Sequence, residues 1–257
     1  MRIGIFITAR LGSTRLAKKH LLMVKGKPII FYLIERIKTE FEKEINNGDV
    51  SIVITTSEEN ENREFENLRC LGIDVFYGSK NNIPLRHYQA AIEHKIDAIV
   101  SVDGDDILCS PKAIREVYKA FSNGSKYIKT FNLPFGMNCS GYTTQFLSLS
   151  LEGHFNDILE TGWGRIFDEK ELVNISIPFE FQGDFLRLTL DYEEDFHFFK
   201  AIIEKCNEDI IAMSDEEIIK TVIENELFKI NEIVTRQYWE NFHRVQNQEM
   251  ASQIKEN

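Results

Sequence analysis

The sequence has few cysteines and no long apolar run. Its four cysteines, Cys70, Cys109, Cys139 and Cys206, lie far apart and form neither a Cys-x-x-Cys pair nor a cluster with histidine. This spacing argues against a zinc site and a disulfide framework, so we expect buried free thiols in a reducing compartment. The apolar run at the amino terminus ends at Thr8, too early for a signal peptide, and no later run approaches the about 20 apolar residues that span a bilayer. We therefore expect a cytoplasmic protein that does not contact a membrane.

Basic residues are also in short supply. The 257 residues include 30 Lys and Arg against 41 Asp and Glu, which gives a formal net charge of −11. Because a large sequence-independent nucleic-acid surface needs clustered Lys and Arg, this balance argues against nucleic acid as a partner. It leaves room for a small basic pocket that binds one polyphosphate. A hydrophobic fraction of 43% and a charged fraction of 28% are typical of a soluble globular protein, and they exclude collagen-like, mucin-like and wholly disordered chains.

The first half of the sequence alternates short apolar runs with longer amphipathic segments. This rhythm predicts an α/β fold in which a parallel sheet is covered by helices. The predicted strands are Ile3–Thr8, Val50–Ile54, Ile73–Tyr77 and Ala98–Val102. A first helix is predicted to begin at Pro28, because Ile29, Leu33, Ile37 and Phe41 follow at intervals of four residues. The further predicted helices are Glu59–Cys70, Leu85–His94 and Pro111–Phe121, and Ser110 is the predicted N-cap of the last.

The second half is less regular. Tyr127–Leu133 and Tyr142–Leu147 resemble strands without a clear helix between them, and Gly153–Arg165 is rich in Gly, Asn and aromatic residues. Regularity returns with a predicted strand at Leu186–Leu190, which ends at Asp191, and with predicted helices at Glu193–Lys205, Asp215–Glu226 and Thr235–Glu249. We therefore expect one domain over residues 1–257, with an embedded substrate lobe at about 127–185 and carboxyl-terminal helices at about 193–250.

The loop after the first predicted strand is the strongest candidate for an anion site. Thr8–Leu16 contains a glycine, hydroxyl side chains, Arg10 and Arg15, and Lys18 and Lys19 follow it. Ligands of open α/β sheets bind at the carboxyl ends of the strands, where this loop would present backbone N–H groups and cations. The loop lacks the order of a Walker A motif. It is therefore either a polyphosphate site of another kind or an ordinary solvated basic loop.

Carboxylates follow two other predicted strands. The turn Asp103-Gly104-Asp105-Asp106 comes directly after Ala98–Val102, and Asp191 follows Leu186–Leu190. Carboxylates at strand ends repel one another unless a cation compensates them, and Mg²⁺ prefers such oxygen ligands together with substrate phosphates. Asp105 and Asp191 are thus candidate metal ligands. The alternatives are an Asp-rich turn that caps the next helix and, for Asp191, a helix N-cap.

These elements together resemble a known family. Ala9-Arg10-Leu11-Gly12-Ser13-Thr14-Arg15-Leu16, with Lys19 three places on, resembles the signature of the cytidylyltransferases that make CMP-activated acidic sugars, among them the 3-deoxy-manno-octulosonate and acylneuraminate enzymes. Leu186–Asp195, Gly78-Ser79 and Leu85-Arg86-His87-Tyr88 look most like the spore-coat polysaccharide branch of that family. The similarity covers about the first 120 residues and then 186–205.

The resemblance implies a fold and a set of roles. The fold would be a three-layer α/β/α arrangement with a mainly parallel, mixed sheet, the Rossmann-like fold of the nucleotide-diphospho-sugar transferases. Arg10, Ser13, Arg15 and Lys19 would hold the triphosphate of CTP within a loop that also includes Ala9, Leu11 and Gly12. Gly78, Ser79 and Arg86 would lie near the cytidine, with Asp103 also beside the nucleotide, and Asp105 and Asp191 would bind Mg²⁺. A homodimer is implied as well.

The sequence departs from the family at three places. Ala17-Lys18 replaces the Pro-Gly before the family's lysine, which leaves open whether Lys18 or Lys19 contacts phosphate. Asp103 replaces a residue that is often Gln, and Ile107 stands where the family has Pro. The middle section does not match the known sugar pockets of the family. Its candidate acceptor-binding residues are Asn138, Tyr142, Trp163 and Arg165. Arg165 either binds a substrate carboxylate through its planar guanidinium or pairs with Asp168 at the surface.

The predicted activity is a metal-dependent transfer of CMP. The hydroxyl of an acidic sugar, most simply the anomeric one, attacks the α-phosphorus of CTP and expels pyrophosphate, in the synthesis of a surface polysaccharide or glycoconjugate. Arg10, Arg15, Lys19 and Asp105 are the predicted catalytic residues, and Asp103 is a candidate general base. Two alternatives remain: a glycosyltransferase that uses Asp103-Gly104-Asp105 as a DxD motif, and a nucleotide-binding protein without catalysis. The aromatic stretches Phe131–Phe135 and Phe179–Phe185 are read as core strands rather than as a dimer interface.

Overall fold

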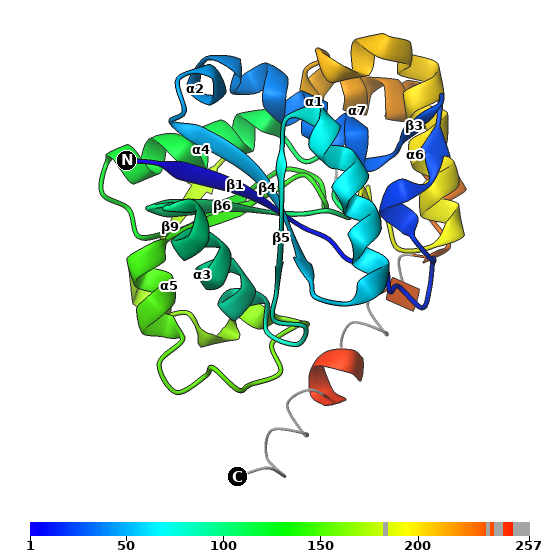
Figure 1. The fold of residues 1–257 in the computed structure, drawn as a ribbon. Coiled ribbons are helices and arrows are strands. Elements are labelled where there is room, and N and C mark those ends of the chain that lie inside the picture. Colours follow the sequence, from blue (N-terminus) through cyan, green and yellow to red (C-terminus); the bar gives the residue numbers. More distant parts are fainter. Residues whose placement is uncertain (182–184, 235–236, 239–243, 249–257) are drawn as a thin grey trace.

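A seven-stranded sheet, in the order β5-β4-β1-β6-β8-β7-β9, forms the centre of the computed structural model (Figure 1). The structure describes residues 1–181, 185–234, 237–238 and 244–248. Strands β5, β4, β1 and β6 are parallel, β8 runs antiparallel to both β6 and β7, and β9 is parallel to β7. The strands are β1 (Ile3–Thr8), β4 (Val50–Ser57), β5 (Asp74–Gly78), β6 (Ala98–Asp103), β7 (Tyr127–Phe131), β8 (Ser140–Thr143) and β9 (Leu172–Ser176), with a separate hairpin of β2 (Met23–Val24) and β3 (Lys27–Pro28).

Helices cover both faces of the sheet. Helices α3 and α5 lie on one face, and α1, α2 and α4 lie on the other, with α6 and α7 packed beyond them. The α-helices are α1 (Ile30–Glu40), α2 (Glu42–Asn46), α3 (Ile83–His94), α4 (Pro111–Ser122), α5 (Thr144–Ser150), α6 (Glu193–Cys206) and α7 (Asp215–Glu224). Short 3₁₀-helices connect them: η1 (Lys19–Leu21), η2 (Asn60–Leu71), η3 (Trp163–Ile166), η4 (Glu169–Glu171), η5 (Asn207–Ile211) and η6 (Leu227–Ile230).

Strand β1 shows why the protein has three layers. Successive side chains of a strand point to opposite faces, so Ile5 and Ile7 join the apolar core beneath α1 and α4, and Phe6 joins the second core beneath α3 and α5. All three side chains are fully buried. A strand that is apolar on both faces needs a helical layer on each side. This arrangement confirms the predicted mainly parallel, mixed sheet in a three-layer α/β/α fold.

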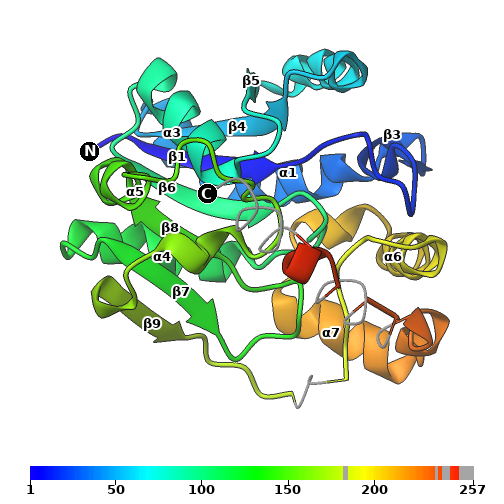
Figure 2. The same ribbon diagram turned by 90° about the horizontal axis from the view of Figure 1, so that it is seen from below.

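The segment predicted to form a substrate lobe contributes strands to the same sheet. β7, β8 and β9 all come from residues 127–176 and extend the sheet on the side away from β5, as Figure 2 shows. Between β8 and β9, residues 151–171 cross the carboxyl edge with two 3₁₀-helices and few regular hydrogen bonds. The irregular part is therefore shorter than the predicted lobe.

Two predicted strands are wrong. Tyr142–Leu147 is a strand only to Thr143, because the Thr143 side chain accepts a hydrogen bond from the N–H of Phe146 and starts α5. Leu186–Leu190 is an extended buried segment outside the sheet, joined to a loop by the hydrogen bond from the N–H of Leu188 to the carbonyl of Phe135 at 2.8 Å. Gly136 permits this contact, since a Cβ there would lie 2.1 Å from the carbonyl oxygen of Leu188.

The predicted helices are mostly confirmed. Ser110 caps α4 with its side chain, Pro111 stands at the first helical position, and the helices at Leu85–His94, Glu193–Lys205 and Asp215–Glu226 correspond to α3, α6 and α7. Glu59–Cys70 is helical but has 3₁₀ geometry. Most of the helix predicted at Thr235–Glu249 lies outside the described residues.

Several predicted core positions are at the surface instead. Phe131 and Phe135 are exposed, as is Phe185, whereas Phe179 and Phe181 pack against the core. The four cysteines are free thiols as predicted, but Cys70 is exposed rather than buried. Among the described residues, none of the helices has the length and apolar character needed to cross a membrane.

Candidate active site

The loop after β1 and the acidic turn after β6 meet at the carboxyl edge of the sheet. β1 and β6 are neighbouring parallel strands in which Thr8 pairs with Asp103, so the two segments leave the sheet side by side. The N–H of Gly104 donates to the carbonyl of Thr8 at 2.8 Å. A Cβ on Gly104 would lie 2.9 Å from both that carbonyl oxygen and the Cβ of Ala9. The absent side chain therefore lets the acidic turn lie directly against the basic loop.

Lys19 joins the two predicted metal ligands. Its ammonium nitrogen Nζ lies 2.6 Å from Oδ2 of Asp105 and 3.1 Å from Oδ1 of Asp191. The Lys19 side chain is buried although it carries a charge. The remaining oxygen of Asp105, Oδ1, lies 2.8 Å from Nε2 of His20, which is also buried. Lys19, rather than Lys18, is thus the lysine at the centre of the site.

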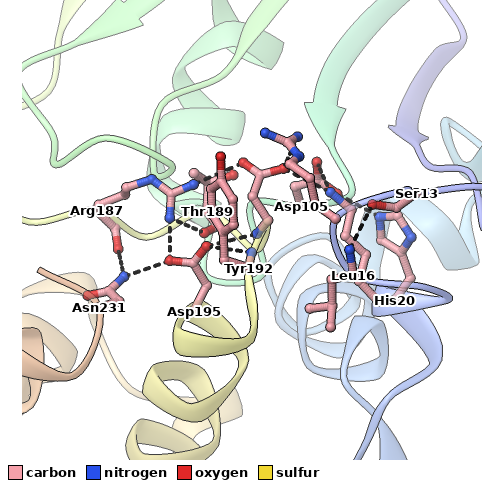
Figure 3. A network of polar contacts seen from close by, with 12 residues as sticks. Ser13, Leu16, His20, Asp105, Arg187, Thr189, Tyr192, Asp195 and Asn231 are labelled. Carbon is pink, nitrogen blue, oxygen red and sulfur yellow. Dashed lines mark hydrogen bonds and ion pairs between the residues drawn. The ribbon is translucent and has the colours of Figure 1, made fainter. Parts of the chain in front are cut away.

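Asp191 belongs to a larger network that is mostly buried, and Figure 3 labels its members His20, Asp105, Arg187, Asp195 and Asn231. Nη2 of Arg15 donates to Oδ1 of Asp191 at 2.5 Å, and Nη2 of Arg187 donates to Oδ2 at 2.9 Å. Arg187 also pairs with Asp195, which accepts a hydrogen bond from Asn231 at 2.9 Å. We call these eight residues the charge cluster: Arg15, Lys19, His20, Asp105, Arg187, Asp191, Asp195 and Asn231.

The structure rejects the two capping alternatives for these carboxylates. Helix α4 is capped by Ser110, so the acidic turn does not cap it. Ahead of α6, Asp195 accepts the N–H groups of Asp191 and Tyr192 at 3.0 and 2.9 Å, and Tyr192 is the N-cap residue. Asp191 therefore does not cap the helix, and its carboxylate contacts Arg15, Lys19 and Arg187 instead.

The charges within the cluster shift one another's ionisation. Burial alone would raise the pKa of Asp105, but the nearby charge of Lys19 and the hydrogen bond to His20 lower it well below its usual range. Burial likewise acts to lower the pKa of Lys19, but Asp105 and Asp191 outweigh it and the pKa is raised. Both groups therefore remain charged across the physiological range, as a buried ion network requires.

Asp105 and Asp191 lie close enough together to bind the same cation. Oxygens of Asp105 and Asp191 converge on a single cationic atom, Nζ of Lys19, which shows that the two side chains can share one cation. Within the described residues no group of three or more His, Cys, Asp and Glu side chains is placed to hold a metal. Mg²⁺ is commonly held by one or two carboxylates plus substrate phosphates, so two carboxylates are sufficient. The donor set fits Mg²⁺ bound together with a nucleotide, provided that Lys19 moves aside.

The outer part of the basic loop is more open. Arg10 is exposed and its Nη1 lies 2.7 Å from a carboxylate oxygen of Glu160, a residue of the irregular segment. Lys18 pairs with Glu64 at 2.5 Å on the surface. Ser13 accepts the N–H of Leu16 at 3.3 Å, and the N–H of Leu11 donates to the Asn62 side chain at 2.8 Å. Ala9 and Leu11 are buried, whereas Gly12 lies at the surface of the loop.

Arg86 shapes the loop that follows β5. It is buried, and its guanidinium donates to the carbonyls of Ser79 at 2.8 Å and Lys80 at 2.9 Å. Burial lowers the pKa of Arg86 to about 10. The N–H of Ser79 lies 3.3 Å from the Gln89 side chain, and Gly78 leaves no space for a Cβ beside Phe76. Gly78, Ser79 and Arg86 therefore form one unit in which Arg86 holds the backbone.

A hollow of about 230 Å³ opens over β6, β8 and β7 at the same edge of the sheet. Its lining combines predicted site residues with others, and we call it the strand-edge pocket: Ser101, Asp103, Asp106, Lys129, Thr130, Asn138, Cys139, Ser140 and Trp163. The structure thus brings Asn138 and Trp163, two of the predicted acceptor-binding residues, to Asp103.

Asp103 and Asp106 flank Asp105 in the sequence but ionise differently from it. The loss of surrounding water and the negative charge of Asp105 raise the pKa of Asp103 to about 6, although the side chain keeps contact with solvent in the pocket. Burial and the charge of Asp103 raise the pKa of Asp106 well above its usual range. The cation that lowers the pKa of Asp105 therefore does not prevent the pKa values of Asp103 and Asp106 from rising.

The other two predicted acceptor-binding residues lie away from this pocket. Tyr142 is fully buried, and its hydroxyl lies 2.5 Å from Nδ1 of His87, whose Nε2 lies 2.8 Å from the Thr8 hydroxyl. Burial lowers the pKa of His87 to about 3, so this chain of side chains is neutral. Arg165 donates to the carbonyls of Ile158 and Thr161, both at 2.7 Å. Both residues stabilise the surroundings of Trp163 rather than the surface of the pocket.

Sequence reasoning missed several residues of the site. Arg187 stands as a charged residue within an apolar run, four places before Asp191, and this spacing was a usable signal. His20 directly follows Lys19, but a lone histidine carries little information. Glu160 and Lys129 have no pattern around them that indicates a site; only the folded chain brings them to the sheet edge.

Comparisons with known proteins identify the family and support the fold. A family model described as cytidylyltransferase matches residues 4–153. An uncharacterized protein of Methanocaldococcus jannaschii is 28% identical over 246 residues, covering 89% of this chain and 93% of the relative. The spore coat polysaccharide biosynthesis protein SpsF of Bacillus subtilis is 26% identical over 220 residues, 80% of this chain and 88% of that protein. A solved structure of a cytidylyltransferase from Leptospira borgpetersenii has a TM-score of 0.74 and 25% identity, covering 89% of this chain and 96% of that one.

Proposed function

The chain belongs to the cytidylyltransferase family, and from this premise we propose that it transfers CMP from CTP to a hydroxyl of an acidic sugar of the ulosonic-acid type. One observation carries the proposal: Arg15 and Lys19 of the basic loop converge on the carboxylates of Asp105 and Asp191 at the carboxyl edge of the sheet. A site with this combination of fixed cations and carboxylates suits a nucleoside triphosphate. The spore-coat relative supports a product used in a surface polysaccharide or glycoconjugate.

The proposed reaction is a displacement at the α-phosphorus of CTP. The sugar oxygen forms a bond to that phosphorus, the bond to the bridging oxygen of the β-phosphate breaks, and pyrophosphate leaves with the negative charge. Such chemistry depends on positioning and charge stabilisation more than on a covalent nucleophile. The positive charges of Arg10, Arg15 and Lys19 stabilise the negative charge of the leaving pyrophosphate. When bound, Mg²⁺ supplies Lewis-acid activation of the phosphate oxygens.

Two cations of the charge cluster must change partners when CTP binds. In this structure Lys19 contacts Asp105 and Asp191, and Arg15 contacts Asp191. Transfer of these cations to phosphate oxygens leaves both carboxylates able to hold a divalent cation. Arg187 keeps its contact with Asp191 and so preserves the orientation of that carboxylate. The same residues thus pair internally before binding and bind the substrate afterwards.

The acceptor half of the reaction belongs to the strand-edge pocket. Asp103, two residues before Asp105, lines this pocket. Its carboxylate can accept the proton of the attacking hydroxyl. Asn138 and Trp163 line the same hollow. On the other side of β1, the unit formed by Gly78, Ser79 and Arg86 lies at the end of β5 and is proposed to contact the cytidine.

Pyrophosphate release tests the proposal. The purified protein, CTP and Mg²⁺ are incubated with a panel of acidic sugars that includes 3-deoxy-manno-octulosonate and N-acetylneuraminate, with neutral hexoses as controls. We expect pyrophosphate only with an acidic sugar. Consumption of a nucleotide-sugar donor in place of CTP would identify a glycosyltransferase, and CTP binding without turnover on the whole panel would identify a non-catalytic protein.

The remaining expectations from the family are also proposals. We propose a homodimer in the cytoplasm, a state that light scattering of the purified protein measures directly. A monomer at all concentrations would contradict it. The exposed Phe131 and Phe135 are the aromatic residues from which an interface would be built.

A further inference from the structure

We propose that Lys129 binds the carboxylate of the acceptor sugar and thereby selects acidic acceptors. This inference rests on the proposed function, and it names the residue that sets the acceptor class. Lys129 lies in β7, lines the strand-edge pocket and was not among the residues indicated by the sequence. Its assignment depends on its register in the sheet, on its unpaired charge and on the chemistry of the acceptor.

The register of three strands places Lys129 and Asp103 on the same face. Ser101 of β6 pairs with Ser140 of β8, and Ser140 pairs with Lys129 of β7. Directly paired residues point to the same side of a sheet, as do residues two apart along one strand, so Asp103 shares that side with Ser101. The pocket floor therefore contains a polar row of Lys129, Ser140 and Ser101, and Asp103 lies on the same face two residues beyond Ser101.

The spacing of this row suits a monosaccharide. Neighbouring strands lie about 4.8 Å apart, so the backbone positions of Ser101 and Lys129 are separated by two such spacings, about 10 Å. Trp163 borders the same hollow and offers an apolar ring face to the sugar.

The charge of Lys129 is unpaired within the part of the chain that the structure describes. Its ammonium lies 5.4 Å from the centre of the Tyr127 ring and is not within ion-pair distance of a carboxylate there. The lysine three residues earlier behaves differently, because Lys126 pairs with Glu171 at 3.0 Å. A protein with a net charge of −11 has many acids available for its lysines. An unpaired lysine that faces a hollow is thus available to an anionic ligand.

The acceptor class matches this distribution of charge. In an ulosonic acid the anomeric carbon carries both the carboxylate and the reacting hydroxyl. Because both groups sit on one carbon, a cation that holds the carboxylate also fixes the direction of the hydroxyl, which can then point toward Asp103 on the same face of the sheet. A neutral sugar gains nothing from Lys129. The pocket therefore selects the acidic sugar and orients it in a single contact.

Kinetics of Lys129→Met test the assignment, with Lys126→Met as the matched control. Each variant is assayed with CTP and with two acceptors, an ulosonic acid accepted by the wild type and its neutral C1 amide. We expect the KM of Lys129→Met for the acid to rise about 10- to 100-fold, the loss typical of a charge-assisted hydrogen bond, with the KM for CTP unchanged. The preference for acid over amide should disappear, Lys129→Arg should restore most of it, and Lys126→Met should behave as the wild type.

Three results would overturn the assignment. An unchanged KM for the acid in Lys129→Met would remove Lys129 from acceptor binding while leaving the proposed function intact. A rise in the KM for CTP alone would make Lys129 a phosphate ligand. Turnover of a neutral sugar and not of any acid by the wild type would reject both the acceptor class and the role of Lys129. Circular dichroism of each variant confirms that the comparison is made between folded proteins.

Discussion

The charge cluster and the strand-edge pocket differ in whether their charged side chains form ion pairs. In the charge cluster every ionised group has a partner: Lys19, Arg15 and Arg187 satisfy Asp105 and Asp191, and most of these side chains are buried. In the strand-edge pocket Asp103 and Lys129 face the hollow without ion pairs among the described residues. The cations of the cluster are thus engaged by carboxylates, whereas Lys129 of the pocket has no carboxylate partner among the described residues.

This difference separates stability from recognition. Removal of one partner from a buried ion network leaves an uncompensated charge and is strongly destabilising, so residues of the cluster hold the fold together as well as the substrate. Exposed charges contribute little to stability because water solvates them almost as well as a partner does. Substitutions in the cluster should therefore change both folding and activity, and substitutions in the pocket should change activity alone.

The largest effect is expected for Asp191→Ala. It leaves Arg187 and Lys19 buried without that carboxylate, so the free energy of unfolding should fall by about 3–5 kcal/mol and CMP transfer should be lost. Urea denaturation followed by circular dichroism measures the first effect. The matched substitution Asp103→Ala should abolish or weaken turnover with little change in stability. Equal stability of the two variants would contradict the comparison.

Next in size is the effect of Lys19→Ala on the use of CTP. The ammonium that should move to the phosphates is lost, so we expect the KM for CTP to rise about 100-fold, with the free energy of a strong charge-assisted contact. Lys18→Ala is the control, because Lys18 pairs with Glu64 at the surface. Steady-state kinetics of both variants decide the point, and similar KM values for CTP would exclude Lys19 from phosphate binding.

A smaller effect concerns metal binding without nucleotide. Because the ammonium of Lys19 lies between Asp105 and Asp191, it repels a divalent cation at that position. Lys19→Met should therefore bind Mn²⁺ about tenfold more tightly than the wild type in the absence of CTP. Electron paramagnetic resonance of free Mn²⁺ measures this affinity, with Lys18→Met as the control. Weaker Mn²⁺ binding by Lys19→Met would show that the lysine does not compete with the metal.

The smallest effect is a change in fluorescence. Trp163 lines the strand-edge pocket, and the sequence has two tryptophans, so the measurement is made in a Trp239→Phe background. We expect the acceptor sugar to change the emission of Trp163 and CTP to change it less. A response to CTP alone would place the nucleotide, and not the sugar, in the pocket.

The regular part of the fold could be predicted from the sequence because its signals are local. Strands β1, β4, β5 and β6 are continuous apolar runs, and Ser110 with Pro111 marks the start of α4. The two wrong strands have different causes, one a local helix cap and the other a contact with a distant loop. The Thr143 side chain starts a helix where hydrophobicity alone predicts a strand, and Leu186–Leu190 lies outside the sheet because Gly136 lets a loop approach its backbone.

The site was predictable to the extent that it follows the ends of strands. Arg15, Lys19 and Asp105 could be placed at one edge because the residues after parallel strands meet there. Arg187 lies four residues before Asp191, so that spacing could have indicated it, whereas Asn231 joins the cluster only through tertiary packing. Tyr142 was predicted to contact the acceptor as part of the middle section, but the sheet buries it against His87. The place of Lys129 in the pocket could not be predicted from the sequence, because it depends on the pairing of Lys129 with Ser140 in the sheet.

Steady-state kinetics of Lys19→Ala and Lys129→Met with both substrates test the division of the site most directly. The measurement yields a KM for CTP and a KM for the acidic sugar for each variant. We expect Lys19→Ala to raise the KM for CTP and to leave the KM for the sugar unchanged, and we expect Lys129→Met to do the reverse. Two variants that raise the KM of the same substrate would contradict the assignment of the charge cluster to the nucleotide and of the strand-edge pocket to the acceptor.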